Sequence, residues 1–319
     1  MEYDLSVVIP VYNEEENIQL LHNSIREALS DLNKSWEVVY VDDGSSDDSL
    51  SILEKITVED PESTTVVALR RNFGQTAAIA AGIDFAHGEI IILMDADMQN
   101  DPADIPLLLQ KIDDGFDVVS GWRRNRQDTF ISRTFPSRIA NWLISSVTGV
   151  HLHDYGCTLK AYKREVITDF KLYGEMHRFI PAYAHSVGAK ITEVPVTHHP
   201  RKFGKTKYGI NRTFKVILDL FTVKFLLSYA NKPIYLFGGA GVLMMAASVF
   251  MIGFLFIRKL LFQTSVVQSS FFLIGIMLMI LGVQSILMGL IAELLARTYH
   301  ESQHKPTYTI RRVINERTP

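Results

Sequence analysis

The sequence contains a run of carboxylates directly after a strongly apolar stretch. Residues 89–102 read EIIILMDADMQNDP, so an apolar run leads into Asp95, Asp97 and Asp101. A strand this apolar is normally covered on both faces, whereas neighbouring like charges repel unless something positive lies between them. Asp95, Asp97 and Gln99 alternate, and alternate residues of an extended segment point to one side. Oxygen ligands suit Mg²⁺ or Mn²⁺, so we predict a metal site that a substrate diphosphate completes.

A second acidic pair follows an earlier apolar run. The stretch WEVVYVDD ends in Asp42 and Asp43. In an open α/β sheet, ligands bind beyond the carboxyl ends of the strands. A single acidic pair can be a helix cap or a solvated turn, which is how we interpret Asp47 and Asp48. Two acidic strand ends in one sheet instead indicate a binding site.

Two loops carry clustered positive charge. The loop at 198–209, HHPRKFGKTKYG, has basic residues around a glycine, and the loop at 121–128, GWRRNRQD, has several arginines. The first is suited to closing over a diphosphate, or it is a solvated turn that attracts anionic lipid. The second either holds a lipid phosphate or is simply a solvated run of charge. No glycine-rich phosphate loop follows the first strand, which argues against an NTPase or a nicotinamide enzyme.

Strands and helices alternate in the first part of the chain. This order predicts an α/β fold with a mostly parallel sheet and helices on both faces. Ser46 or Asp47 is expected to cap the helix that follows the second strand. The expected strands are 5–12, 36–41, 64–72, 89–94 and 117–122, and the expected helices are 13–29, 75–88 and 102–114.

Composition excludes several classes of protein. The net charge of -3 over 319 residues argues against a nucleic-acid partner. Cys157 is the single cysteine, so there is no intramolecular disulfide, and we predict that it is a small buried hydrophobe. The chain opens on acids and a short apolar run, unlike a secretory signal. We therefore expect the N-terminal domain to lie in the cytoplasm.

Two uncharged segments, 233–257 and 269–292, each exceed the roughly 20 residues needed to span a bilayer. The alternative is a pair of core helices in a soluble domain. Two spans place both termini on one side, and a modest excess of flanking Lys and Arg favours the cytoplasm. Apolar residues at helical spacing in 131–147 and 213–229 predict helices that either lie on the membrane surface or face a core.

Several stretches occur together in one order: LSVVIPVYNEEENI, VVYVDDGSSDDS, RNFGQTAAIAAGI, DADMQNDP, DYGCTLKAYKREV and RKFGKTKYG, followed by two hydrophobic spans. This pattern resembles the polyprenyl-phosphate glycosyltransferases, membrane members of the family 2 glycosyltransferases similar to dolichol-phosphate mannose synthase and bacterial undecaprenyl-phosphate sugar transferases. The resemblance covers nearly the whole chain. It implies a GT-A fold and inverting transfer of one sugar from a nucleotide sugar, with uracil as the expected base, to a polyprenyl phosphate.

The resemblance also implies roles for individual residues. Catalytic roles fall on Asp97, Asp154, Arg201 and Lys207, and the metal ligands are Asp95, Asp97 and Gln99. The base pocket contains Pro10 and Glu14, Asp42 and Asp43 lie by the nucleotide, and Arg201 and Lys207 meet the donor diphosphate. The charge of the two basic loops, rather than the resemblance, adds Lys205 as a candidate for the diphosphate and Arg123 and Arg126 as candidates for a lipid phosphate.

Asp154 lies where many inverting relatives place a catalytic carboxylate. A phosphate acceptor needs no strong base, however, because its second pKa is about 6 and it is mostly dianionic at neutral pH. We therefore expect Asp154 to orient a substrate rather than to remove a proton. The stretch HLHD, 151–154, lacks further ligands close by, so we do not interpret it as a zinc site.

Together with the two spans, the resemblance implies an integral protein of the bacterial inner membrane that acts on nucleotide sugar and polyprenyl phosphate with Mg²⁺ or Mn²⁺, and we expect it to form a homo-oligomer. A catalytically silent membrane scaffold with the same fold is the alternative. A processive polysaccharide synthase is disfavoured because no Q-x-x-R-W motif is present. The expected regions are a catalytic domain at 1–212, a juxtamembrane helix at 213–232, the two spans, and a cytoplasmic tail at 293–319.

Overall fold

The computed structural model describes residues 3–124, 144–145, 148–168, 176–200, 234–263, 265–267, 269–302 and 307–315. The chain divides into two compact units. The first comprises Met1–Val223 together with Pro306–Pro319, and the second comprises Lys224–Lys305. The predicted helix at 213–229 and nearly all of the one at 131–147 lie outside the described residues.

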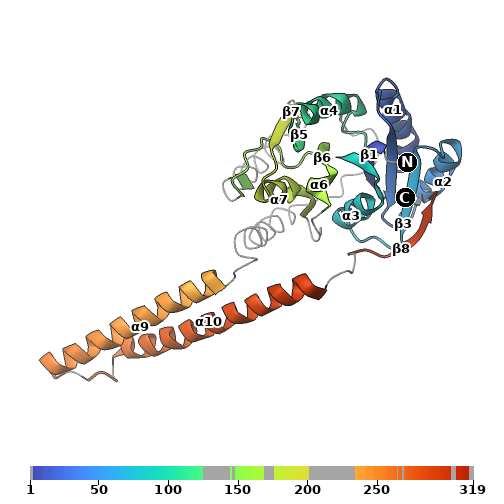
Figure 1. Cartoon of the computed structure of the whole chain (residues 1–319). Helices are drawn as coiled ribbons and strands as arrows, with labels where there is room; N and C mark the ends of the chain where they lie inside the picture. The colour runs from blue at the N-terminus through green and yellow to red at the C-terminus, as the bar shows by residue number, and fades with distance from the viewer. Residues whose placement is uncertain are drawn as a thin grey trace. The chain divides into compact units, whose positions relative to one another are not determined.

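The first unit is built on a mixed sheet with the strand order β7-β5-β6-β4-β1-β2-β3-β8 (Figure 1). Strands β4, β1, β2 and β3 are parallel neighbours, which confirms the predicted parallel core. Strand β6 runs antiparallel between β4 and β5, and β5 pairs in parallel with β7. The strands are β1 Tyr3–Val11, β2 Trp36–Asp42, β3 Thr64–Leu69, β4 Gly88–Leu93, β5 Val118–Trp122, β6 Lys160–Lys163, β7 Ile191–Pro195 and β8 Ile310–Ile314.

Helices cover both faces of this sheet (Figure 1). One layer contains α1 Ile18–Ser30, α2 Ser49–Glu59, the 3₁₀ turn η1 Pro102–Asp104 and α4 Ile105–Asp113. The other contains α3 Gln75–Phe85, α6 Arg164–Ile167, η3 Met176–Phe179 and α7 Ile180–Ser186. The arrangement is the GT-A-like α/β architecture that the sequence predicts.

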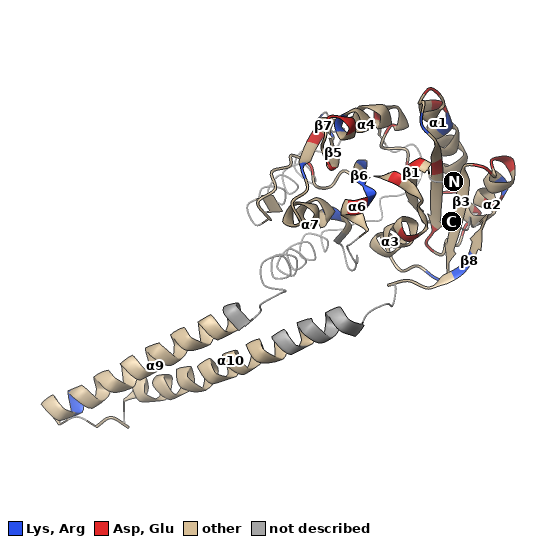
Figure 2. Cartoon of the chain, viewed as in Figure 1, with Lys and Arg blue, Asp and Glu red and all other residues tan. Residues whose placement is uncertain are grey.

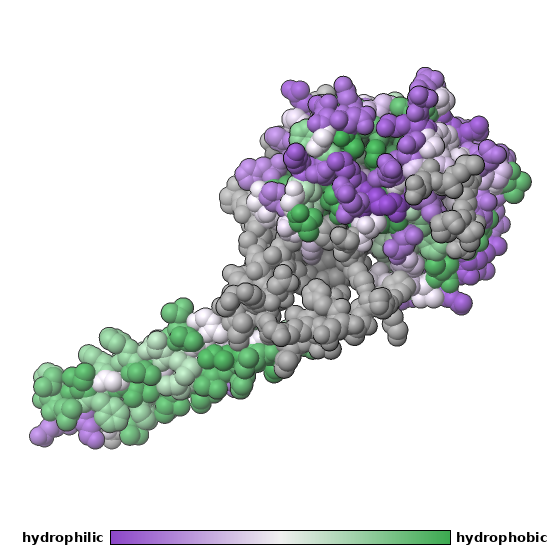
Figure 3. Space-filling model, viewed as in Figure 1, coloured by the Kyte–Doolittle hydropathy of each residue, from purple (hydrophilic) through white to green (hydrophobic). Residues whose placement is uncertain are grey.

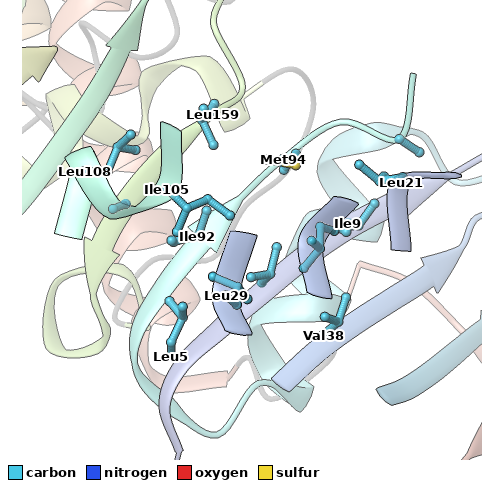
Figure 4. Close-up of a cluster of buried hydrophobic side chains, with 14 of the residues drawn as sticks. Leu5, Ile9, Leu21, Leu29, Val38, Ile92, Met94, Ile105, Leu108 and Leu159 are labelled. Atoms are coloured by element: carbon cyan, nitrogen blue, oxygen red, sulfur yellow. The ribbon is translucent and has the colours of Figure 1, made fainter. Parts of the chain in front are cut away.

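The main core lies between the sheet and the α1 layer (Figure 4). Apolar residues of α1 recur at helical spacing and pack on alternate residues of β1; both sets are fully buried. The α1 residues are Ile18, Leu21, Ile25 and Leu29, and the β1 residues are Leu5, Val7, Ile9 and Val11. On the other face, Gly82 lets α3 approach the sheet closely, because a Cβ there would lie 2.2 Å from Cγ1 of Val8.

Some element boundaries differ from expectation. Helix α3 ends at Phe85, and Gly88 is the first residue of β4 rather than a helix terminator. Helix α2 begins at Ser49, and its N-cap residue is Asp48, which makes no capping bond with its side chain. Asp47, one residue earlier, accepts a hydrogen bond from the Ser49 amide at 3.1 Å, the contact with a first-turn amide that was predicted for it. Cys157 is fully buried, as predicted.

Strand β8 was not predicted: the C-terminal residues return to the first unit and pair antiparallel with β3, with Val67 opposite Val313. Side chains fasten this strand to its surroundings. Tyr308 Oη donates to Asp84 at 2.6 Å, Arg312 forms an ion pair with Glu54, and Asn315 Nδ2 donates to backbone oxygens of Pro61 and Thr64 at 2.6 and 2.8 Å. The outer edge of β3 is therefore covered.

The second unit is a pair of long helices, α9 Ile234–Phe262 and α10 Ser270–Ser302. Their segments Phe237–Phe262 and Ser270–Ala292 are long and apolar enough to cross a membrane. Only 17% and 11% of the residues in their most apolar stretches are buried, unlike the helices of a soluble core. Figure 3 shows hydrophobic residues over the described parts of both helices, and Figure 2 shows Lys or Arg near the C-terminal end of α9.

Small residues let the two helices pack closely. A Cβ on Gly241 would lie 2.6 Å from the Gly282 backbone oxygen. Ser248 Oγ donates to the Gly275 oxygen at 2.6 Å, and Ser285 Oγ donates to the Phe237 oxygen at 2.7 Å. Close contact and hydroxyl bonds of this kind hold helices together in lipid, where burial of apolar surface gives no driving force.

Candidate active site

The acidic strand ends lie at one edge of the sheet. Strand β1 pairs in parallel with β2 on one side and with β4 on the other, and Val11 lies opposite Asp42. Asp42 and Asp43 therefore leave the sheet at the same edge as the residues that follow β4. This is the edge at which open α/β sheets bind ligands.

Asp95 is held at both carboxylate oxygens. Gln75 Nε2, at the start of α3, donates to Oδ1 at 2.7 Å, and Thr158 Oγ1 donates to Oδ2 at 2.6 Å. Burial and the charge of Asp97 raise the pKa of Asp95 to about 6, although Thr158, Arg123 and Lys160 oppose the shift. A buried carboxyl beside a second carboxylate is stabilised when a cation arrives.

Asp97 and Gln99 are not in an extended segment, so the argument from alternating residues was wrong here. Met98 between them has a φ of 59°, and Asp97 Oδ1 accepts from the Gln99 amide at 3.1 Å. Asp97 is 7% exposed. Asp101 has a structural role instead: its Oδ1 accepts a hydrogen bond from the Ala103 amide at 3.0 Å and so caps η1.

The donor chemistry fits Mg²⁺ or Mn²⁺. Asp95 and Asp97 offer carboxylate oxygens, and the pKa of Asp95 is raised first by its burial and second by the negative charge of Asp97. Within the described residues, no three His, Cys, Asp or Glu side chains gather as a complete metal site. Mg²⁺ is usually held by one or two carboxylates plus substrate phosphates, so two carboxylates suffice for a site that a diphosphate completes.

Asp43 is fixed by the loop between β3 and α3. Its Oδ1 accepts from the Phe73 amide at 2.7 Å and its Oδ2 from the Gly74 amide at 2.9 Å. Burial raises the pKa of Asp43, and these amides oppose the shift. Gly44 has a φ of 68°, and a Cβ on it would lie 2.5 Å from the backbone carbon of Arg71. The carboxylate and the turn that presents it thus pack directly against this loop.

Two neighbouring loops are hydrogen-bonded to each other beside Asp42. The Asn13 amide donates to Ser45 Oγ at 3.0 Å, and the Glu14 amide donates to Ser49 Oγ at 2.9 Å. Asp42 Oδ1 accepts from the Ser45 amide at 3.2 Å, and burial raises the pKa of Asp42. Pro10 is partly exposed in β1. Of the residues expected around the base, Pro10 therefore lies in β1 and Glu14 on a loop that is hydrogen-bonded to the loop after β2.

Asp154 is engaged by Arg123 in a two-pronged ion pair. Arg123 Nε donates to Oδ2 at 2.7 Å and Nη2 donates to Oδ1 at 3.0 Å; Asp154 is 3% exposed. The Gly156 amide also donates to Oδ1, at 3.1 Å. Burial would lower the pKa of Arg123, but the hydrogen bonds and charge of Asp154 outweigh it and raise that pKa.

Three residues at this centre were not singled out from the sequence. Gln75 and Thr158 contact Asp95 directly, and Lys160 is buried beneath the loop that carries Thr158. Neutral polar residues such as Gln75 and Thr158 give no distinctive pattern in one sequence. Lys160 does give a signal, because a lysine among apolar residues in CTLKAY is rarely buried without a reason.

The remaining predicted residues lie outside the described part of the chain. They are Arg126, Arg201, Lys205 and Lys207. The described chain stops at Pro200, beside the acidic motif: the His199 amide donates to the Gln99 backbone oxygen at 2.9 Å. The basic loop therefore starts next to Gln99.

Sequence comparison assigns the chain to a family. The sequence model described as Glycosyl transferase family 2 matches residues 6–170. The chain belongs to glycosyltransferase family 2. This family 2 glycosyltransferase is 41% identical over 318 residues to the dodecaprenyl-phosphate galacturonate synthase of Rhizobium johnstonii, covering 99% of this chain and 94% of that protein. It is 37% identical to the undecaprenyl-phosphate 4-deoxy-4-formamido-L-arabinose transferase of Salmonella choleraesuis, covering 99% and 95%.

Solved structures share the fold of this glycosyltransferase at low identity. Glucosyl-3-phosphoglycerate synthase from Mycobacterium tuberculosis, in complex with Mn²⁺, uridine diphosphate and phosphoglyceric acid, aligns with a TM-score of 0.55 and 18% identity over 70% of this chain and 78% of that one. Residues 1–349 of TarS from S. aureus, in complex with UDP-GlcNAc, align with a TM-score of 0.52 and 21% identity over 70% and 66%. These likenesses support the GT-A architecture.

Proposed function

We propose that this glycosyltransferase moves a single sugar from a nucleotide sugar, a UDP-sugar by preference, to a polyprenyl phosphate, with undecaprenyl phosphate as the expected acceptor. The observation that carries the proposal is similarity over 99% of the chain, membrane helices included, to enzymes whose names specify sugar attachment to polyprenyl phosphates. The acidic edge of the sheet supplies a chemically suitable centre for the donor.

The described residues have complementary parts in donor binding. Pro10, Glu14 and Asp42 would line the pocket for base and ribose, with Asp43 fixed beside them by the Phe73 and Gly74 amides. The metal site would comprise Asp95, Asp97 and Gln99. A bound Mg²⁺ or Mn²⁺ supplies positive charge that stabilises the leaving diphosphate.

Further positive charge would come from the basic loop. Arg201, Lys205 and Lys207 would approach the diphosphate, since the loop starts beside Gln99. In the reaction, an acceptor phosphate oxygen forms a bond to the anomeric carbon while the bond from that carbon to the nucleotide diphosphate oxygen breaks. Attack on the face opposite the leaving group inverts the anomeric configuration. Alignment of the three atoms is a large part of the rate enhancement.

Proton removal is not required of Asp154. The acceptor phosphate has a second pKa of about 6 and is already mostly dianionic at neutral pH. Asp154 is bound by Arg123 through two hydrogen bonds. We therefore assign Asp154 a positioning role, in which it holds the guanidinium of Arg123. That guanidinium has further N–H donors that can bind the acceptor phosphate. Arg126 would bind the same phosphate.

The two long apolar helices support a reaction at a bilayer. We propose that the spans anchor the protein in the bacterial inner membrane with the catalytic unit and both termini in the cytoplasm, as a homo-oligomer. The product would be a lipid-linked sugar for modification of cell-envelope glycans. The regions named above, from the catalytic domain at 1–212 to the segment at 293–319, would serve these roles.

The test is a transfer assay with the purified full chain. Undecaprenyl phosphate, Mg²⁺ or Mn²⁺ and a panel of radiolabelled UDP- and GDP-sugars are incubated with wild type and with Asp97→Ala. Label entering the lipid fraction from one donor, metal-dependent and absent in the variant, is the expected result and also names the sugar. No transfer from any donor, including uronic and amino-pentose sugars, would overturn the proposal.

A further inference from the structure

Lys160 is buried beneath the loop 154–158. It starts strand β6, is 3% exposed, and its Nζ donates to the backbone oxygens of Tyr155, at 3.3 Å, and of Cys157. Among the described residues it forms no ion pair. Burying an amino group costs free energy unless its hydrogen bonds are satisfied, so this lysine is held by the carbonyls of a single loop.

The same loop delivers two side chains to the active site. Thr158, directly after Cys157, donates to Asp95 Oδ2 at 2.6 Å. Asp154, at the other end, receives both hydrogen bonds of Arg123. Backbone contacts that shape the loop between them are the Gly156 amide to Asp154 and the two carbonyls that accept from Lys160. A shift of this loop would therefore move Thr158.

We propose that Lys160 and Thr158 are positioning residues for the divalent cation: Lys160 fixes the loop, and Thr158 transmits that constraint to Asp95. The inference rests on the proposed function insofar as Asp95 belongs to a Mg²⁺ or Mn²⁺ site. It assigns a task to a buried lysine whose amino group donates to backbone oxygens of this loop.

The geometry explains why the constraint has an effect. Asp95 has one oxygen on Gln75, from α3, and the other on Thr158, from the loop. With both in place, the carboxylate plane is fixed from two different elements. Without the Thr158 hydroxyl, the Asp95 carboxylate can still rotate about its remaining hydrogen bond to Gln75. Hydrogen bonds to metal-binding carboxylates typically change metal affinity by about 10–100-fold when removed.

The experiment measures Mn²⁺ binding rather than transfer. Full-length protein in detergent, saturated with UDP, is titrated with Mn²⁺, and free Mn²⁺ is followed by electron paramagnetic resonance. The variants are Thr158→Val, Lys160→Met and their combination. The matched control for the hydroxyl is Thr57→Val, which removes a buried hydroxyl that donates to the Leu53 oxygen within α2. The matched control for the lysine is Lys163→Met: Lys163 is the last residue of β6, and the change breaks its ion pair with Asp117.

Both single variants are expected to weaken Mn²⁺ binding by about tenfold or more, with the controls unchanged. Lys160 is expected to act through Thr158, so the double variant should bind Mn²⁺ about as well as the single variant with the lower affinity. Such non-additivity is expected of coupled sites. Thr158→Ser, which keeps the hydroxyl, should bind like wild type. A role limited to folding would lower thermal stability without this pattern.

If Thr158→Val binds Mn²⁺ with the affinity of wild type, the inference is overturned. This variant alone is sufficient for the test if Lys160→Met fails to fold. Additive effects in the double variant would also overturn the serial relationship. Failure of the proposed metal site has a different signature, since wild-type protein would then bind no Mn²⁺ in the presence of UDP. Failure of sugar transfer is measured separately, by the transfer assay.

Discussion

Arg123 holds Asp154 through two hydrogen bonds, from Nε to Oδ2 at 2.7 Å and from Nη2 to Oδ1 at 3.0 Å. A carboxylate so engaged is a poor proton acceptor, because taking up a proton would break one of the bonds and leave a buried guanidinium uncompensated. The pairing thus agrees with a phosphate acceptor, which brings its own negative oxygen to the reaction.

Asp154→Asn is therefore expected to retain measurable transfer, with kcat lowered by no more than about 100-fold, the effect of misplacing a reacting group. Asp97→Ala is expected to lower kcat on the order of 10³-fold or more, because charge stabilisation of the leaving group is lost. Both are measured by lipid-linked label at saturating donor. Equal and complete loss in two folded variants would show that Asp154 takes part in the chemistry directly.

Gly44→Ala should weaken binding of UDP. Its Cβ would lie 2.5 Å from the Arg71 carbon and 2.7 Å from the Asn72 nitrogen, so the loop whose amides hold Asp43 must move. We expect an increase in Kd on the order of tenfold or more, since small displacements at a binding centre are costly. Calorimetry with UDP and Mn²⁺ measures it.

Gly115 provides the control for that change. It also has a positive φ, 97°, but a Cβ there would meet nothing within 4 Å. Gly115→Ala should therefore cost only backbone strain, about 1–3 kcal/mol, and leave the Kd for UDP unchanged. If the two variants bind UDP equally well, contact between Gly44 and the Arg71 loop has no part in donor binding.

Ending the chain at Lys305 should destabilise the catalytic unit. This change removes β8 and its bonds from Tyr308 to Asp84 and from Asn315 to Pro61 and Thr64, which leaves the edge of β3 unpaired. We expect the Tm in detergent to fall by about 5 °C or more. A chain ending at Asn315 keeps the whole strand and should melt like wild type; matching losses in both would argue against β8 as the cause.

Stability should depend on pH through His22, which is 1% exposed and has Nδ1 3.1 Å from Tyr40 Oη. Burial lowers the pKa of His22 from its ordinary 6.5, against the opposing charge of Asp60. The unfolded chain then binds this proton more readily than the folded one, so stability present above pH 6.5 is lost as pH falls below it.

Thermal melts across this range test the effect. His22→Gln should show a shallower fall in Tm on acidification than wild type, whereas the same change at the exposed His185 should follow the wild-type curve. Parallel curves for wild type and His22→Gln would assign the acid sensitivity to other groups.

The parts of the fold that rest on local pattern could be predicted from the sequence. Apolar runs separated by amphipathic or small-residue helices gave the parallel core, and the carboxylates at the ends of β2 and β4 indicated its functional edge. Strand β8 could not be predicted, because RRVI is short and basic and is paired with a strand some 240 residues earlier. The antiparallel strand β6 was missed for a similar reason, since KAYK lacks an alternating pattern.

The site was predictable in its residue types but not in its contacts. Arg123 and Asp154 were both singled out, but for separate roles, and only the fold brings their side chains together across 31 residues. The turn at Met98 overrode the simple alternation argument for Asp97 and Gln99, because a local side-chain bond to the Gln99 amide competes with extended backbone.

Strand β8 also fixes an order of events during synthesis. It follows both α9 and α10 in the chain, so the ribosome makes it only after both candidate spans. Until then the outer edge of β3 stays open to other strands, which is a known route to misassembly. The catalytic sheet can therefore be completed only after both apolar helices have been synthesised. A chain whose synthesis stops before β8 keeps an unpaired edge at β3 that is prone to aggregation.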